Sequence, residues 1–322
     1  MLGSATMWRM RRSSSGTIMC LASGVGFGAM AIFGKEAYGA GTTVATLLVV
    51  RFTLAAIMFW GLILASGAAK ELRALSRRDL GLGLALGACG YAAQAACYFA
   101  ALERIDASLL SLLLYTFPAM VAAAAVALGR ERLDSRRLMA LGLALGGLVL
   151  VLAGAGTGTL DPLGAALGIG AAVVYSTYIL VSERVVRRVR PALLSPLVCT
   201  GAAISLTIGS TLIGQLRPGQ VTLGGWGWLA CLALVSTVGA ISLFFAGLKR
   251  VGPTTASILS TVEPVTTVAL AFLVFGETLG AIQLAGGALV IAAVVVVNAR
   301  RLRGRARYAE VGPLGVVEPA TE

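Results

Sequence analysis

Two ionisable side chains stand inside long apolar stretches of this chain, where charge is rare. Glu263 lies about nine residues into the apolar run 254–275 and is followed by Pro264, and Arg51 lies about eight residues into the run 43–66. A charged group at the centre of a membrane helix costs about 2.5–3.5 kcal/mol on the insertion scale, so such a residue generally marks a binding site or an ion path. We therefore predict that Glu263 and Arg51 contact a solute or a coupled ion.

An alternative stays open for each of these two residues. Glu263, protonated or hydrogen-bonded, would then only tie helices together. Arg51 would either extend toward the lipid headgroups or pair with a carboxylate for structure, since long basic side chains readily reach an interface. In the functional case Arg51 attracts an anionic group of the solute. The sequence does not show whether Arg51 and Glu263 meet.

Polar and aromatic side chains recur at i, i+3 and i+7 in four apolar runs, which places each set on one helix face. The sets are Tyr91, Gln94 and Tyr98; Ser108, Ser111 and Tyr115; Tyr175, Tyr178 and Ser182; and Ser260, Glu263 and Thr267. Small-molecule sites combine aromatic walls with a few polar groups, so Gln94 and the tyrosines are predicted to line a cavity. Ser260 and Thr267 are candidates because they share the Glu263 face. Interhelical hydrogen bonds are the alternative, favoured where serine or threonine stands alone.

Several kinds of chemistry have no residues to support them. The chain has no histidine, and its five cysteines lie in apolar runs without CxxC spacing. No GxxxxGK[ST] motif occurs, and the GxG strings lack the strand and helix of a dinucleotide site. We therefore expect no metal, no cofactor and no ATP hydrolysis. A membrane-embedded enzyme acting on lipid, which would need a metal or clustered carboxylates, is the alternative from another class, as is a scaffold that transports nothing.

Membrane-spanning helices have to hold these side chains. Of the 322 residues, 58% are hydrophobic and 12% charged, against about 25% charged in soluble domains. A helix needs about 20 apolar residues to cross the hydrocarbon core. Ten runs approach this length: 16–36, 43–66, 80–101, 106–129, 137–155, 162–183, 192–214, 223–248, 254–275 and 279–299. The predicted fold class is an all-α polytopic membrane protein with ten transmembrane helices.

Basic residues cluster in alternate loops. With the N-terminus inside, 22 of the 26 lysines and arginines lie in inner segments, while Lys35, Arg104 and Arg217 lie outside and Arg51 lies within a span. This positive-inside bias places both termini in the cytoplasm. Because the charge of +12 is divided among short clusters, we expect no nucleic-acid partner. Residues 1–34 resemble a signal peptide, but their apolar stretch exceeds the usual core of about 7–15 residues, so we expect a retained helix.

The chain also repeats itself. Residues 98–133 align without a gap onto residues 244–279, with eleven identities at an offset of 146. Because each half would hold five spans, an odd number, the halves are expected to enter the membrane in opposite directions. Such inverted repeats hold a solute near the bilayer midplane.

The aligned halves share some residues and differ in others. Pro118 matches Pro264, and both are hinge candidates, whereas Glu263 matches Phe117, so the carboxylate belongs to one half only. Glu131 and Glu277 form a second identical pair at matching helix ends. We expect this second pair to fix helix ends and loop geometry.

Three segments carry a resemblance to a known family. They are "RFTLAAIMF", which opens with Arg51, "ALERIDASLLSLLLYTFPAMVAAAAVALGRERL" and "GLKRVGPTTASILSTVEPVTTVALAFLVFGETL". The chain resembles a ten-helix member of the drug/metabolite transporter superfamily, of the EamA type, over about residues 16–300. The resemblance implies a bacterial inner-membrane carrier, often an exporter of amino acids, metabolites or drugs, that works by alternating access.

The expected organisation follows from the resemblance and the repeat. It comprises a cytoplasmic segment 1–15, a first EamA-like repeat 16–155 with helices one to five, a second repeat 162–300 with helices six to ten, and a disordered cytoplasmic tail 301–322. The expected function is secondary transport, preferably export, of a small metabolite, amino acid or drug-like solute. The partners are that solute, the lipid bilayer and a coupled proton or other ion. The solute's identity, the direction, the coupling ion and the oligomeric state stay open.

Overall fold

The computed structural model describes the backbone of residues 2–67, 70–71, 74–129, 135–154, 161–186, 188–251, 256 and 259–310. Every regular element in these ranges is a helix. The α-helices are α1 (Leu2–Gly28), α2 (Met30–Gly39), α3 (Val44–Ala65), α5 (Arg77–Ala85), α6 (Ala92–Leu102), α7 (Ala107–Leu114), α8 (Phe117–Ala127), α9 (Ser135–Gly154), α10 (Pro162–Val186), α11 (Pro191–Leu212), α12 (Leu223–Ala233), α13 (Ala240–Val251), α15 (Val262–Phe275) and α16 (Ala281–Glu310). Two π-helices, η1 (Leu86–Tyr91) and η3 (Leu234–Gly239), and a 3₁₀ turn, η2 (Pro218–Gln220), complete the set.

Seven helical stretches in the described chain are long and apolar enough to cross a membrane. They are Ser15–Gly39, Val44–Ala65, Arg77–Leu102, Ala107–Ala127, Pro162–Ser182, Ala192–Leu212 and Leu223–Val251. Three shorter apolar helices, Leu138–Gly154, Val262–Phe275 and Ala281–Val296, lie in the three remaining runs that the sequence singled out. The described part of the chain is therefore all-helical, with the long apolar helices of a multi-pass membrane protein.

The C-terminal boundary differs from the expectation. The apolar run ends before the arginines that start at Arg300, and disorder was expected from residue 301, yet α16 continues to Glu310. The extension is rich in arginine and alanine, which are good helix formers, so the loss of hydrophobicity does not end the helix. Glu131 and the end of the tail, 311–322, lie outside the described residues.

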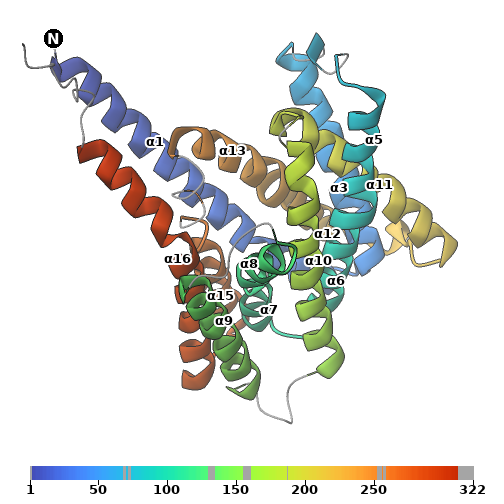
Figure 1. Cartoon of the computed structure of the whole chain (residues 1–322). Coiled ribbons are helices and arrows are strands. Elements are labelled where there is room, and N and C mark those ends of the chain that lie inside the picture. The colour runs from blue at the N-terminus through green and yellow to red at the C-terminus, as the bar shows by residue number, and fades with distance from the viewer. Residues whose placement is uncertain are drawn as a thin grey trace, which may run out of the picture.

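Helices from the two ends of the chain interleave. Helix α1 packs along α13, and α10 packs along α6, while α3 packs against α11 and α9 against α16 (Figure 1). In Figure 1 the green α9 and the red α16 run side by side along one flank of the bundle. Each of these pairs joins a helix from the first half of the sequence to one from the second half. The fold therefore depends on contacts between the halves.

Glycines set the spacing at two of these crossings. A Cβ atom placed on Gly147 of α9 would lie 2.6 Å from the carbonyl oxygen of Gly286 on α16, and one on Gly286 would lie 2.7 Å from that of Gly147. At the second crossing, a Cβ on Gly87 of η1 would lie 2.0 Å from the carbonyl oxygen of Val198 on α11. No side chain fits at such distances, so these backbones approach closely only because glycine is present.

Two helices are interrupted just before the shared prolines. Helix α7 ends at Leu114 and α8 starts at Phe117, with Pro118 in its first turn. Helix α15 starts at Val262, with Pro264 in its first turn. Proline has no N–H group and is tolerated in a first turn, where that group would have no helical partner. The interruptions lie where the hinge prediction placed them, and the hinge role itself stays a prediction.

Candidate functional site

A cavity of about 610 Å³ lies between helices of both halves of the chain. Its lining contains every candidate binding residue from the sequence except Thr267: Arg51, Tyr91, Gln94, Tyr98, Tyr115, Tyr175, Tyr178, Ser260 and Glu263, together with Pro118 and Ser182. A volume of this size suits a small organic molecule. The polar stripes on separate helices thus face one another across a shared space. That these residues bind a solute stays a prediction.

Arg51 is the buried cation of this cavity. It lies midway along α3, its residue is 2% exposed, and its Nε donates a hydrogen bond to the Thr237 hydroxyl oxygen at 2.9 Å. Its guanidinium carbon lies 5.1 Å from the ring centre of Phe52 and 5.3 Å from that of Phe99. Among the residues whose side chains are described, no carboxylate lies within 4.0 Å of it. Arg51 therefore neither extends to a lipid headgroup nor forms a described salt bridge.

Thr237 fixes the direction of this arginine. It lies in η3, its residue is fully buried, and its hydroxyl donates to the carbonyl oxygen of Leu232 at 3.0 Å. Because the hydroxyl proton is used there, the oxygen is left to accept from the Nε of Arg51. π-helical turns often mark functional sites, and this one places Thr237 opposite Arg51. The pair joins the two halves of the chain.

Thr237 was not singled out from the sequence. It belongs to no polar stripe, because the neighbours at i±3 and i±4 include Leu234, Ala233 and Ile241. One signal could have found it. If the alignment of the repeats, at an offset of 146, is continued from Tyr98 back to Tyr91, then Tyr91 aligns with Thr237. Tyr91 ends η1 and Thr237 lies in η3, so a π-helix occurs near the matching position of both halves.

Glu263 is the carboxylate of the cavity. It lies in the first turn of α15 and is partly buried. The Tyr115 hydroxyl, from the break between α7 and α8, donates to the Ser260 carbonyl oxygen and lies 3.3 Å from Oε2 of Glu263. Glu263 and Arg51 form no described ion pair with each other, yet both line the cavity. The site thus holds two opposite charges at separate points of its wall.

Aromatic rings form a continuous wall between these points. Tyr91 stacks on Tyr178 with ring centres 5.8 Å apart, and Tyr178 stacks on Tyr175 at 6.2 Å. Phe117 meets Tyr175 edge-on at 4.6 Å and Tyr115 at 5.8 Å. The sequence indicated the tyrosines, but not Phe117 or the other apolar lining residues. Apolar residues of a cavity have no pattern that separates them from the core.

Thr267 lies outside the lining of the cavity. Its residue is 3% exposed, and its hydroxyl lies 3.0 Å from the carbonyl oxygen of Gly28 and 3.2 Å from that of Glu263. It faces α1 and not the cavity, because it lies one helical turn beyond Glu263, where this face of α15 meets α1. The interhelical role that the sequence left open is the one the structure shows. Ser108 and Ser111 also lie away from the cavity, and the Ser111 hydroxyl donates to the Ser108 carbonyl oxygen at 2.8 Å.

Comparisons with known proteins find related sequences along most of the chain. A family model described as the EamA-like transporter family matches residues 14–153 and 162–299, one copy of the unit in each half. An uncharacterized transporter of Archaeoglobus fulgidus is 32% identical over 62% of this chain and 70% of its own length. The uncharacterized transporter YcbK of Bacillus subtilis is 27% identical over 92% of this chain and 96% of its own.

A solved structure shares the fold. It is 21% identical in sequence, with a TM-score of 0.62, and the match covers 90% of this chain and 99% of that chain. At this identity the likeness concerns the fold alone. The shared arrangement of helices extends over almost the whole of that chain.

Proposed function

The chain belongs to the EamA-like transporter family and is a membrane transporter, and we propose that it is a secondary transporter that exports a small solute by alternating access. The observation that carries the proposal is the cavity of about 610 Å³, whose wall is built by both repeats and holds one buried cation and one carboxylate. A site shared by two repeats is the arrangement through which repeat-built carriers expose a solute to either side in turn. Export follows the family resemblance.

The proposed architecture has ten spans in two inverted halves, 16–155 and 162–300, with segments 1–15 and 301–322 in the cytoplasm. The helix pairs support it, because exchanging the halves turns the α1–α13 pair into the α10–α6 pair. The π-helix near the same position of each half and the break before each shared proline follow the same exchange. The three shorter apolar helices would then be the fifth, ninth and tenth spans.

The solute we propose is a zwitterion with an aromatic or apolar body. The N–H groups of Arg51 that Thr237 does not engage provide donors suited to a carboxylate, and arginine binds carboxylates with two parallel hydrogen bonds. Glu263 offers a partner for an ammonium group or for a coupled proton. The ring wall beside them suits an aromatic body, and a cation over such rings gains further attraction. An aromatic amino acid has all three parts.

A set of three related compounds tests this assignment. L-phenylalanine, L-phenylalaninamide without the carboxylate and 3-phenylpropanoate without the ammonium group differ only at the two charges. Thermal unfolding of the purified carrier reports binding, because a ligand of the native state raises the melting temperature. We expect L-phenylalanine to stabilise most, with each single-charge analogue weaker. The assignment is wrong if the amide stabilises as well as the amino acid, or if none of the three stabilises.

Two variants complete the test. Arg51→Gln should remove the advantage of L-phenylalanine over the amide. Arg104→Gln, which breaks the exposed Arg104–Asp161 pair at 3.2 Å, is the matched control and should change nothing. Uptake of labelled L-phenylalanine into proteoliposomes then separates a carrier from a binding protein without transport.

A further inference from the structure

A second carboxylate, far from the cavity lining, joins the two halves. Oε1 of Glu277 accepts hydrogen bonds from Nζ of Lys35 at 2.8 Å and from the backbone N–H of Ala107 at 3.1 Å. Its Oε2 accepts from the backbone N–H and the hydroxyl of Ser108, at 3.0 and 2.9 Å. The Glu277 side chain is 8% exposed. The carboxylate is thus almost enclosed and accepts four hydrogen bonds.

Glu277, in the second half of the chain, caps helix α7 of the first half. The first N–H groups of a helix have no helical partner, and a side chain just before the helix generally satisfies them. For α7 that residue is Asp106, yet within the described chain its side chain makes no cap hydrogen bond. It is 68% exposed and lies 3.7 Å from Lys35. Glu277, 170 residues after Ala107, supplies the cap, and its charge also suits the positive end of the α7 dipole.

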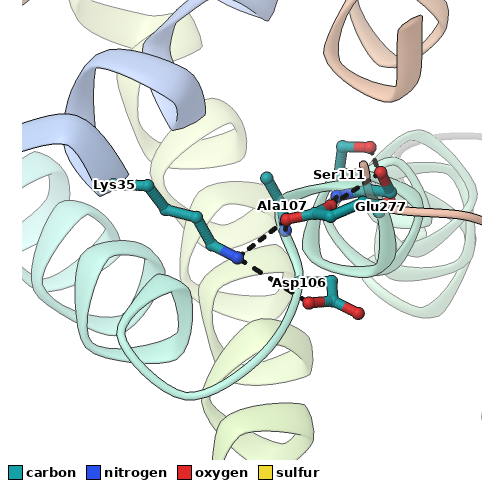
Figure 2. Close-up of polar contacts among 6 residues, drawn as sticks. Lys35, Asp106, Ala107, Ser111 and Glu277 are labelled. Atoms are coloured by element: carbon teal, nitrogen blue, oxygen red, sulfur yellow. Dashed lines mark hydrogen bonds and ion pairs between the residues drawn. The ribbon is translucent and has the colours of Figure 1, made fainter. Parts of the chain in front are cut away.

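The backbone aims Glu277 at this helix. Gly276 ends α15 with φ of 68°, a left-handed conformation that favours glycine, and so turns the chain back toward α7. In Figure 2 the side chains of Lys35 and Glu277 point toward each other, with Asp106 beside them. Lys35 comes from α2 and lies over the Phe275 ring at 5.6 Å. Three segments therefore converge on one carboxylate.

The contact lies at the opposite end of α7 and α15 from the cavity. Tyr115, just after α7, meets Ser260 and Glu263 at the start of α15, while Ala107 at the start of α7 meets Glu277 just after α15. The two helices are therefore tied at both ends. They cannot separate at the Glu277 end unless its hydrogen bonds are broken.

Further hydrogen bonds close the same end of the bundle. Thr43 donates its hydroxyl to the Gln215 carbonyl oxygen at 3.1 Å, and the Arg217 N–H donates to the Thr46 hydroxyl at 2.9 Å. These bonds join the start of α3 to the loop after α11. Under the proposed topology all of these segments face the outside. The cavity would then be shut off from the outside in the state described here.

We propose that Glu277, Lys35 and the N-terminus of α7 form an outer latch, which holds the outer end closed and releases when the carrier opens outward. The latch rests on the proposed alternating-access function and orientation. It spans the two repeats, so rocking of one against the other must break it. Its release exposes a carboxylate and the N–H groups of Ala107 and Ser108 to water, which replaces the lost hydrogen bonds.

Distances across the latch test this proposal without any solute. Gly39 at the end of α2 and Ala281 at the start of α16 are exposed, and a Cβ on Gly39 meets nothing within 4 Å. Spin labels at Gly39→Cys and Ala281→Cys, on a background without native cysteines, report the width of the outer end in nanodiscs. Glu277→Gln keeps the shape of the side chain but removes its charge.

We expect Glu277→Gln to raise the ratio of open to closed molecules by about tenfold or more, because hydrogen bonds to a charged group are among the stronger ones. Lys35→Met should act in the same direction, and it serves as the second variant should Glu277→Gln fail to fold. Arg104→Gln, which breaks an exposed ion pair of the loops at this end, is the control and should leave the distances unchanged. Unaltered distances in a folded Glu277→Gln or Lys35→Met carrier overturn the latch.

Failure of the latch and failure of the proposed function give different results. If wild-type proteoliposomes take up L-phenylalanine and the variants keep wild-type distances, the latch is wrong and transport stands. If the variants open the outer end but wild-type protein transports nothing, the latch stands and the proposed solute and function fail.

Discussion

Nε of Arg51 and the hydroxyl oxygen of Thr237 are 2.9 Å apart, although 186 residues separate them in the chain. Their hydrogen bond crosses from one repeat to the other inside the membrane region. It fixes the orientation of the guanidinium and uses only the Nε–H group, so Thr237 engages none of the other N–H groups of Arg51. The charge that we propose binds the solute is therefore oriented by the repeat that does not carry it, and the proposed rocking of the halves would act on this bond directly.

Thr237→Val is the sharpest test of that orientation. Valine has nearly the same shape but cannot accept a hydrogen bond, so the Arg51 Nε loses its partner. A buried donor without a partner costs about 1–3 kcal/mol. When this cost falls on the bound state, L-phenylalanine binding weakens by about 5- to 150-fold. Thr237→Ser keeps the hydroxyl and should restore binding. Calorimetric titration of L-phenylalanine into the wild type and the two variants gives the three affinities. Equal affinity of the Thr237→Val variant and the wild type would contradict the orienting role.

Glu263→Gln should abolish or uncouple transport while membrane levels stay normal. The amide keeps the size of the side chain and can still meet Tyr115, but it carries no charge and releases no proton. Initial rates of L-phenylalanine uptake, with and without a proton gradient, give the result. An unchanged rate and an unchanged response to the gradient would show that Glu263 only ties helices together.

The crossing of α9 and α16 offers a comparison of two neighbouring glycines. A Cβ on Gly147 would lie 2.6 Å from the Gly286 carbonyl oxygen, whereas one on Gly146 meets nothing within 4 Å. Gly146→Ala should therefore keep or raise the melting temperature, through a gain in helix propensity of up to about 1 kcal/mol. Gly147→Ala should lower it by the equivalent of about 1–3 kcal/mol, as overpacking does. Similar melting temperatures would mean that the helices do not cross as closely as described.

The outer latch should persist in mild acid. Burial opposes ionisation of Glu277, but hydrogen bonds from Lys35 and Ser108 outweigh it and hold the pKa of this carboxyl below its ordinary value. A lowered pKa in the closed state means that the latch is at full strength above the ordinary value, about 4.3, and weakens as the pH falls through the lower one.

The spin-label distances across Gly39 and Ala281 measure this directly. They should stay constant between about pH 8 and pH 5, the range above the ordinary carboxyl pKa. Lys35→Met removes one of the stabilising hydrogen bonds, so its pH-dependent opening should begin at a higher pH than in the wild type. Opening of the wild-type outer end between about pH 7 and 5 would contradict the account of Glu277.

Sequence reasoning found what periodicity can show. The apolar runs and the positions of the tyrosines, Arg51 and Glu263 follow from composition and helical spacing, and the structure gathers these side chains around one cavity. The family follows from motifs in both halves. Spacing along one helix also indicates which residues share a face, but it does not say what each end of that face meets. Thr267 shares the Glu263 face and yet lies outside the cavity lining for this reason.

Contacts between distant segments were beyond the sequence. Thr237 has no pattern of its own, and its meeting with Arg51 depends on a π-helix that no propensity indicates. Glu277 was expected to fix a helix end. It caps α7, which lies far from Glu277 in the sequence. Such partners follow from how the repeats pack, so only the folded arrangement reveals them.

Locking the two repeats together tests the central claim, movement of one half against the other around a shared cavity. Lys35→Cys and Glu277→Cys place thiols on the two sides of the latch, where a short reducible cross-linker can join them. With labelled L-phenylalanine in proteoliposomes, the account predicts that cross-linking stops uptake and that reduction restores it. Uptake that continues at its full rate in fully cross-linked protein would contradict alternating access and indicate a fixed pore.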